Sequence, residues 1–202
     1  MGREYWRSFF IAAADIAGHG VPGAMVSLVC SNALNRSIKE FGLIDTGKIL
    51  DKARELVIGT FEKSNEEVKD GMDISLLCID LKNKNIFWCG ANNPLWFIQN
   101  NELHEIKADK QPIGKTDNPK PFTTHKIKLK ENITFYLSTD GLADQFGGPN
   151  GKKFKYKQFE EVLLLVNEKP LYQQLDLISQ KFEDWKGSLE QVDDVCMIGI
   201  KL

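Results

Sequence analysis

Between residues 74 and 106, short apolar segments alternate with short polar connections, and this pattern restricts the fold more than any other feature of the sequence. The apolar segments span 74–79, 86–90, 95–98 and 103–106. The connections, such as 82–85 and 99–101, are rich in Asn and Lys, and they are too short for a crossover between parallel strands. We therefore expect antiparallel hairpins in this part of the chain.

Helical and strand-like patterns surround the hairpins in a segregated order. The expected helices follow apolar residues at helical spacing and span 24–41, 46–63, 156–166 and 171–185. The remaining expected strands span 8–15, 123–129, 133–139 and 195–202. This order favours an α+β fold, with helices packed on antiparallel sheet, over a doubly wound parallel sheet. Because no linker, repeat or low-complexity tract interrupts the pattern, we expect a single domain over 1–202.

Composition narrows the classes of partner and compartment. A net charge of −2 gives no basic field for nucleic acid or for an anionic membrane surface, so a protein or small-molecule partner is favoured. No stretch reaches the roughly 18 to 20 apolar residues that span a bilayer. We expect a cytoplasmic protein, with the cytoplasmic output domain of a membrane-anchored sensor as an alternative.

The cysteines and histidines do not form a metal-binding pattern. The four cysteines contain no C-x-x-C pair, and each lies in an apolar stretch, so we expect reduced, buried thiols. They are Cys30, Cys78, Cys89 and Cys196. The three histidines are far apart in the sequence and have no zinc spacing, so zinc is not expected.

Acidic residues stand at the ends of three expected strands. Asp15 closes FFIAAAD, Asp140 closes ITFYLSTD, and Asp193 and Asp194 open the last strand, DDVCMIGI. If the last strand lies antiparallel to the strands that end at Asp15 and Asp140, its first residue falls at the same sheet edge as their last residues. Three carboxylates would then meet.

Such a cluster would repel itself unless cations were bound, and Mg²⁺ or Mn²⁺ prefers carboxylate and carbonyl oxygens. Two metals close together can activate water and neutralise a phosphoryl group. Gly18, Gly20 and Gly141 follow the aspartates and would let ligands approach the backbone. Each aspartate taken alone has an alternative role as a cap of the next turn or helix. For Asp73 and Asp144 we expect that turn or cap role.

An alternative interpretation of the segment after Asp15 is a nucleotide-binding turn. Gly18, Gly20 and Gly23 spell G-x-G-x-x-G. A dinucleotide-binding unit needs a second parallel strand that ends in an acid roughly 20 residues later, whereas the helical pattern here continues through Glu40 and another helix follows. In addition, Asp15 would repel a pyrophosphate, so this alternative is remote.

His19 lies between two of these glycines. A histidine in this position can hydrogen-bond the turn, or it can donate a proton near a leaving group because it titrates in the useful range. It is the candidate catalytic side chain.

Taken together, five motifs resemble the stage II sporulation protein E (SpoIIE)-type domain. This domain is the bacterial branch of the metal-dependent, protein phosphatase 2C-like superfamily. The motifs are DIAGHGVPGA at 15–24, DGMDISL at 70–76, GANNPL at 90–95, STDGLADQ at 138–145 and VDDV at 192–195.

The resemblance implies an antiparallel β-sandwich flanked by helices in α-β-β-α layers, a centre of two Mn²⁺ or Mg²⁺ ions, and hydrolysis of phosphoserine or phosphothreonine on proteins. By position, Asp15 would bridge both metals and the Ile16 carbonyl would bind one of them. Asp140 and Asp193 would complete the set, with Asp194 orienting the loop.

The resemblance also implies a place at the output end of a signalling protein, downstream of a sensor or receiver module. Phosphorylated anti-anti-sigma-type regulators are the implied substrates. A homodimer through the helices after Gly23 and Thr46 is an alternative to simple core packing of those helices. Family domains usually begin with an upstream strand bearing a Gly-Asp-aromatic signature, which residues 1–10 do not contain, so we expect a domain without that strand. A catalytically degenerate binding module is the alternative function.

Overall fold

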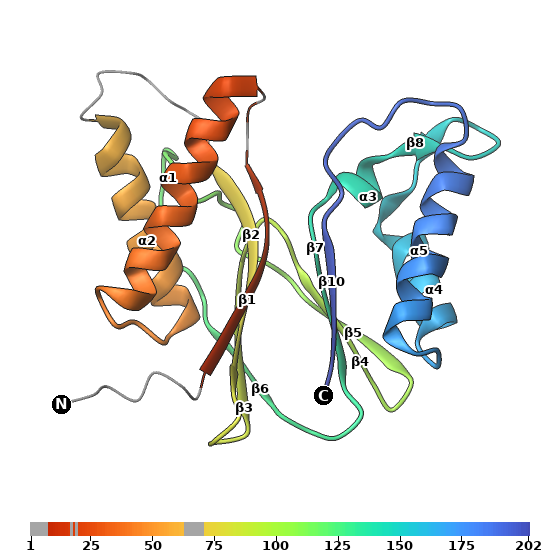
Figure 1. Cartoon of the computed structure of the whole chain (residues 1–202), viewed down its shortest axis with the longest axis horizontal. Helices are drawn as coiled ribbons and strands as arrows, with labels where there is room; N and C mark the ends of the chain where they lie inside the picture. Colours follow the sequence, from red (N-terminus) through yellow and green to blue (C-terminus); the bar gives the residue numbers. More distant parts are fainter. Residues whose placement is uncertain (1–7, 17, 19, 63–70) are drawn as a thin grey trace. The chain divides into compact units, whose positions relative to one another are not determined.

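The computed structural model describes residues 8–16, 18, 20–62 and 71–202 (Figure 1). The chain forms two compact units. Unit 1 consists of Met1–Pro94 and Lys107–Leu129, and unit 2 of Leu95–Ile106 and Lys130–Leu202. Each unit contains a four-stranded sheet.

Unit 1 combines two helices with an antiparallel sheet in the order β1-β2-β3-β6. Its elements are β1 (Ser8–Ile16), α1 (Gly20–Lys39), α2 (Thr46–Phe61), β2 (Met72–Asp80), β3 (Asn85–Ala91) and β6 (His125–Lys128). Figure 1 shows α1 and α2 side by side next to this sheet. Val26 of α1 and Leu50 of α2 share one buried core with Ile74 of β2, so a single apolar face of each helix fixes it to the strands.

The second helix of unit 1 begins at a side-chain cap. The Asp45 carboxylate accepts a hydrogen bond from the Lys48 backbone N–H at 3.0 Å and another from the Thr124 hydroxyl at 2.7 Å. Partial burial is the largest single contribution and raises the pKa of Asp45. The hydrogen bonds and the Lys48 charge together outweigh it, so the pKa lies below its ordinary value. The cap therefore fixes the start of α2 to the segment that leads into β6.

Unit 2 also packs helices against an antiparallel sheet, here in the order β10-β7-β4-β5. The strands are β4 (Leu95–Gln99), β5 (Glu102–Ile106), β7 (Thr134–Ser138), β8 (Phe146–Gly147), β9 (Lys152–Lys153) and β10 (Met197–Lys201). The helices are α3 (Gly141–Asp144), α4 (Lys155–Val166) and α5 (Leu171–Lys186). Trp96 of β4 meets Phe159 of α4 edge to face, with ring centroids 4.9 Å apart.

The expected α+β class, with antiparallel sheets and helices, is confirmed, and the long helices and strands end within a few residues of their expected positions. The last strand begins at Met197 and not at 195, so Asp193 and Asp194 lie in the loop before it. Cys30, Cys78 and Cys89 are buried thiols as expected, and burial raises the pKa of Cys30 to about 11. The expectation for Cys196 is wrong, because this residue precedes an edge strand and is exposed.

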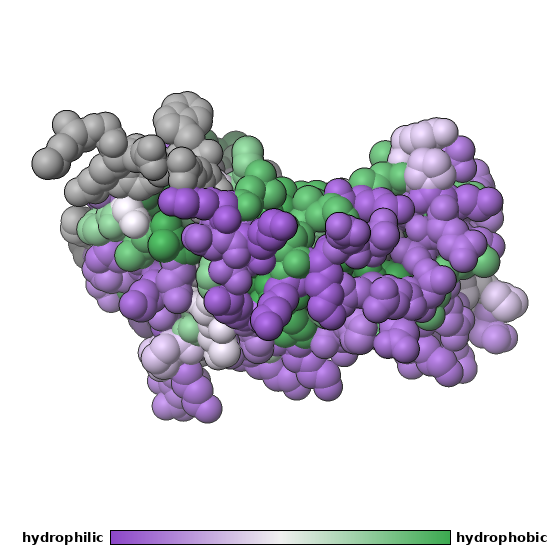
Figure 2. All heavy atoms as spheres, turned by 90° about the horizontal axis from the view of Figure 1, so that it is seen from below, coloured by the Kyte–Doolittle hydropathy of each residue, from purple (hydrophilic) through white to green (hydrophobic). Residues whose placement is uncertain are grey.

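In the view of Figure 2, hydrophilic side chains cover most of the face, with smaller apolar areas between them. No helix in the described part of the chain has the length and hydropathy needed to cross a membrane.

Candidate metal centre

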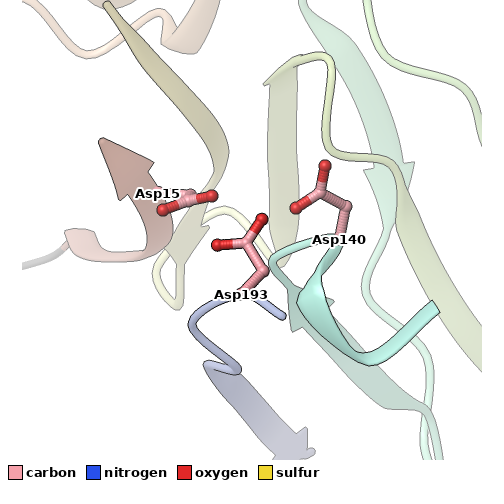
Figure 3. Close-up of side chains that lie close together, drawn as sticks. All are labelled: Asp15, Asp140 and Asp193. Carbon is pink, nitrogen blue, oxygen red and sulfur yellow. The ribbon is translucent and has the colours of Figure 1, made fainter. Parts of the chain in front are cut away.

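The three predicted ligand aspartates come from three different segments, which Figure 3 shows with their side chains. Asp15 is the next-to-last residue of β1 in unit 1, Asp140 directly precedes α3, and Asp193 lies in the loop before β10. The strand β10 is antiparallel to β7, with Met197 opposite Ser138, as expected for Asp140. The strand that ends at Asp15 was also expected to lie antiparallel to the last strand. This pairing is wrong, because β1 pairs with β2 in the other sheet.

Asp140 is a partly buried carboxylate with two anionic neighbours, Asp193 and Asp144. Although it occupies the position before α3, its side chain makes no capping hydrogen bond. Its Oδ1 atom is buried, and no hydrogen-bond partner among the described residues reaches it. Burial raises the pKa of Asp140, and the charges of Asp193 and Asp144 raise it further, whereas Lys153 lowers it. A buried anionic oxygen without a donor fits a bound cation.

The loop that carries Asp193 is held close to Asp140 by the residues next to that aspartate. The Thr139 hydroxyl donates to the Asp194 carbonyl oxygen at 3.0 Å and accepts from the Cys196 N–H at 3.0 Å. Gly141 is buried, and a Cβ at this position would overlap the same Asp194 carbonyl oxygen. Asp194 thus positions the loop through its backbone, and its N–H also donates to Asp193 Oδ1 at 2.7 Å.

Replacing Gly141 with alanine is expected to displace this loop. The added Cβ would overlap the Asp194 carbonyl, and overpacking of this kind costs about 1 to 3 kcal/mol of stability. We expect weaker Mn²⁺ binding together with a lower free energy of unfolding, measured by calorimetric titration and by urea denaturation.

Gly59→Ala is the matched control for this substitution. An added Cβ at Gly59, within α2, would meet nothing within 4 Å, and alanine favours helix over glycine by up to about 1 kcal/mol. Unchanged Mn²⁺ binding in Gly141→Ala would show that the close approach at Gly141 does not position Asp193.

In unit 1, a second carboxylate lies directly across from Asp15. Asp73 is its partner in the register of β1 and β2, and the Asn92 side chain donates to Asp73 Oδ1 at 2.8 Å. Like charges at opposed positions of antiparallel strands destabilise the pair, and a cation relieves the repulsion. The expected turn or cap role of Asp73 is wrong, since the residue lies within a strand. Only the strand register, which the sequence pattern left open, could have placed it beside Asp15.

Asp144 was also expected to have a turn or cap role. It ends the short helix α3, and its carboxylate forms an ion pair with Lys153 at 3.0 Å. Its N–H donates to the Asp140 carbonyl oxygen at 2.9 Å. It therefore contributes to the structure around Asp140 through both backbone and side chain.

The glycines after Asp15 have a conformational role. Gly18 and Gly20 have φ values of 103° and 66°, which favour glycine, and a Cβ on Gly23 would lie 2.6 Å from the Gly18 carbonyl oxygen. Gly18 lies between β1 and α1, and Gly20 and Gly23 belong to the first residues of α1. Because β1 is antiparallel to β2, the described strands of unit 1 lack the parallel neighbour that a dinucleotide-binding turn requires. His19 lies outside the described residues, and its catalytic role stays a prediction.

One comparison with known proteins identifies the family of the chain. The family model of stage II sporulation protein E (SpoIIE) matches residues 7–202. No curated protein sequence matches the chain.

Solved structures with a similar fold are PP2C-type phosphatase domains and related signalling domains. The SiaA-PP2C domain of Pseudomonas aeruginosa is similar with a TM-score of 0.87 and 28% identity, over 99% of this chain and 78% of that one. The PP2C phosphatase domain of SpoIIE from Bacillus subtilis, solved with a fragment of its regulatory domain, gives 0.74 and 16%, over 97% and 55%. The RsbU and RsbW domains of a Mycobacterium tuberculosis protein give 0.71 and 18%, over 96% and 51%. The chain spans only about half of the last two proteins. It belongs to the stage II sporulation protein E family and has the fold of PP2C-type phosphatases.

Proposed function

We propose that this chain is a metal-dependent phosphatase that removes phosphate from phosphoserine or phosphothreonine on a regulatory protein in bacterial signalling. The observation that carries the proposal is the buried Oδ1 atom of Asp140, which has no hydrogen-bond donor in the described part of the chain and has the charge of Asp193 nearby. A purely structural carboxylate in this position would be expected to cap α3 or to pair with a base. Membership of the stage II sporulation protein E family supports this reaction class.

The proposed ligands are oxygen atoms of three aspartates and of one backbone carbonyl. Asp15, Asp140 and Asp193 each offer one carboxylate oxygen, and the Ile16 carbonyl is proposed as a further ligand, for two Mn²⁺ or Mg²⁺ ions. RsbX, which has the same fold with a TM-score of 0.62 at 17% identity, is described in complex with magnesium. When bound, such ions lower the pKa of a water molecule and neutralise the phosphoryl group for in-line displacement.

The proposed site residues would have different roles. Asp15, Asp140 and Asp193 would hold the cations. Gly18 and Gly20 would leave room for a phosphate beside the backbone. The same expectation for Gly141 is wrong, because the Asp194 carbonyl oxygen occupies the space beside it. His19 is proposed as the donor of a proton to the departing serine or threonine oxygen.

The proposed partners follow the systems in which the similar structures occur. Those structures include RsbU and RsbW domains, a stressosome protein and a SiaA domain. We propose a phosphorylated anti-anti-sigma-type regulator as the substrate and an upstream sensor or receiver module as the source of control. Buried thiols without a disulfide partner among the described cysteines favour action in the cytoplasm.

The proposed homodimer has support on α1. Val21, Met25 and Leu28 recur at helical spacing and are 74%, 63% and 72% exposed. An uncharged apolar stripe of this kind can pack against a second copy of the same helix.

The test is hydrolysis of p-nitrophenyl phosphate and of a phosphoserine-containing anti-anti-sigma protein. We expect both reactions to require Mn²⁺ or Mg²⁺ and to stop when EDTA is added. A chain that binds Mn²⁺ and the phosphoprotein but releases no phosphate from either substrate would support the catalytically degenerate binding module. A chain that binds no divalent cation would overturn the metal centre itself.

A further inference from the structure

A fully buried glutamine holds the loop that carries Asp193. The Gln145 amide nitrogen donates to the Glu190 carbonyl oxygen at 3.0 Å, and its side-chain oxygen accepts from the Val192 N–H at 3.2 Å. The same amide also donates to the Phe146 carbonyl at 3.0 Å. Gln145 therefore bonds to the loop backbone immediately before Asp193, and its exposed fraction is 0%.

A second anchor holds the other side of Asp193. The Thr139 hydroxyl bonds to the backbone of Asp194 and of Cys196, each at 3.0 Å. Thr139 and Gln145 stand on the two sides of Asp140 in the sequence. The segment 139–145 thus contains Asp140 and also forms hydrogen bonds to the loop on both sides of Asp193.

The loop needs these anchors because it has little structure of its own. Between α5 and β10 the chain forms no regular helix or strand, and Asp193 is exposed. An unanchored loop would sample many conformations, and each residue fixed in one of them costs about 1 to 2 kcal/mol in backbone entropy. The two side chains supply contacts that hold Asp193 near Asp140 before any ligand binds.

We propose that Gln145 is a positioning residue of the metal centre, which sets the place of the Asp193 carboxylate relative to Asp140. The inference rests on the proposed metal-dependent function. Residues that orient metal ligands typically change metal affinity by about 10- to 100-fold when they are replaced. An uncharged amide suits this role because it offers both donors and an acceptor to the loop backbone.

The backbone of residue 145 is fixed independently of its side chain. The Gln145 carbonyl oxygen accepts from the Phe154 N–H at 2.9 Å and from the Trp185 indole N–H at 3.2 Å. These bonds involve the backbone of residue 145 and do not depend on the atoms of its side chain. A change of the side chain therefore releases the loop without removing the turn after α3.

The experiment compares Gln145→Met with Gln174→Met. Gln174 is an equally buried amide in unit 2, 1% exposed, which accepts from the Tyr136 hydroxyl and donates to the carbonyls of Asn167 and Lys169. Both variants lose a buried hydrogen-bonding amide of the same size, so both are expected to lower the melting temperature. Only Gln145→Met should weaken Mn²⁺ binding, by about 10- to 100-fold in a calorimetric titration. Its half-saturating Mn²⁺ concentration for hydrolysis should rise equally, with kcat largely regained at saturating Mn²⁺.

The outcomes separate this inference from the proposed function. If the unaltered chain binds Mn²⁺ and Gln145→Met binds it equally well, or if Gln174→Met weakens binding as much, the positioning role is overturned and the phosphatase proposal stands. If the unaltered chain binds no Mn²⁺, the metal centre fails and the positioning role fails with it. Should Gln145→Met not fold, Gln145→Asn keeps the amide but shortens its reach, and the same loss of affinity is expected.

Discussion

Replacing Asp15 with asparagine is expected to lower the Mn²⁺-dependent kcat/KM of the chain by about three orders of magnitude. Asparagine keeps the size of the side chain and one oxygen but removes the negative charge that would bind both cations. A metal centre contributes several kcal/mol of transition-state stabilisation, and each 1.36 kcal/mol changes the rate tenfold. The rate with p-nitrophenyl phosphate at saturating Mn²⁺ measures the effect.

Asp80→Asn provides the matched control in the same sheet. Asp80 also stands at the end of a strand, but its carboxylate accepts from the Asn83 N–H at 3.0 Å and from the Asn83 side chain at 2.7 Å. These bonds lower the pKa of Asp80, as expected for a turn-capping carboxylate. The activity of Asp80→Asn should therefore equal that of the unaltered chain. Activity within a factor of ten of that level in Asp15→Asn would contradict the bridging role of Asp15.

The contrast between Asp80 and Asp140 shows how far the sequence could identify the site. Both aspartates end an apolar strand-like segment, and residue type alone does not separate a cap from a metal ligand. The structure separates them, because Asp80 caps a turn whereas Asp140 Oδ1 has no hydrogen-bond partner in the described part of the chain. In the sequence, two features distinguished Asp140 from Asp80: the acidic strand ends at Asp15 and Asp193, and the STDGLADQ motif that contains Asp140.

The long elements were predictable because their period is repeated many times. The helix α2 follows apolar residues over 16 residues, and an aspartate cap precedes it. The helix α3 has only four residues and the strands β8 and β9 have two each, so no period is expressed and all three were missed. The start of β10 was placed too early because the Cys196 N–H bonds to the Thr139 side chain instead of continuing the strand.

Gln145 could not be identified from the sequence as a functional residue. Its partners at Glu190 and Val192 are backbone atoms that lie 45 and 47 residues away along the chain. Every residue type has these backbone atoms, so the residue types at the partner positions do not reveal the hydrogen bonds. The same holds for Asp73, whose position opposite Asp15 depends on the register of two strands separated by two helices.

In the metal-free state, Asp140→Asn is expected to be more stable than the unaltered chain at neutral pH. Burial, and then the charges of Asp193 and Asp144, raise the pKa of Asp140 above its ordinary value of 3.8. The ionised form is therefore less favourable in the folded chain than in the unfolded chain. As the pH falls through the raised pKa towards 3.8, Asp140 becomes protonated in the folded state and the penalty disappears. Urea denaturation in EDTA should show an advantage for the variant at neutral pH that shrinks in acid.

Addition of Mn²⁺ should reverse the order of the two proteins. A ligand that binds only the folded state stabilises it by about 2.7 kcal/mol at one hundred times its dissociation constant. The unaltered chain should gain this stability, whereas Asp140→Asn, with one ligand fewer, should gain much less. Asp176→Asn, an exposed aspartate on α5, serves as the control and should follow the unaltered chain in both conditions. If Asp140→Asn were less stable than the unaltered chain in EDTA at neutral pH, the carboxylate would be stabilising the fold, and the reason for assigning a cation to it would be lost.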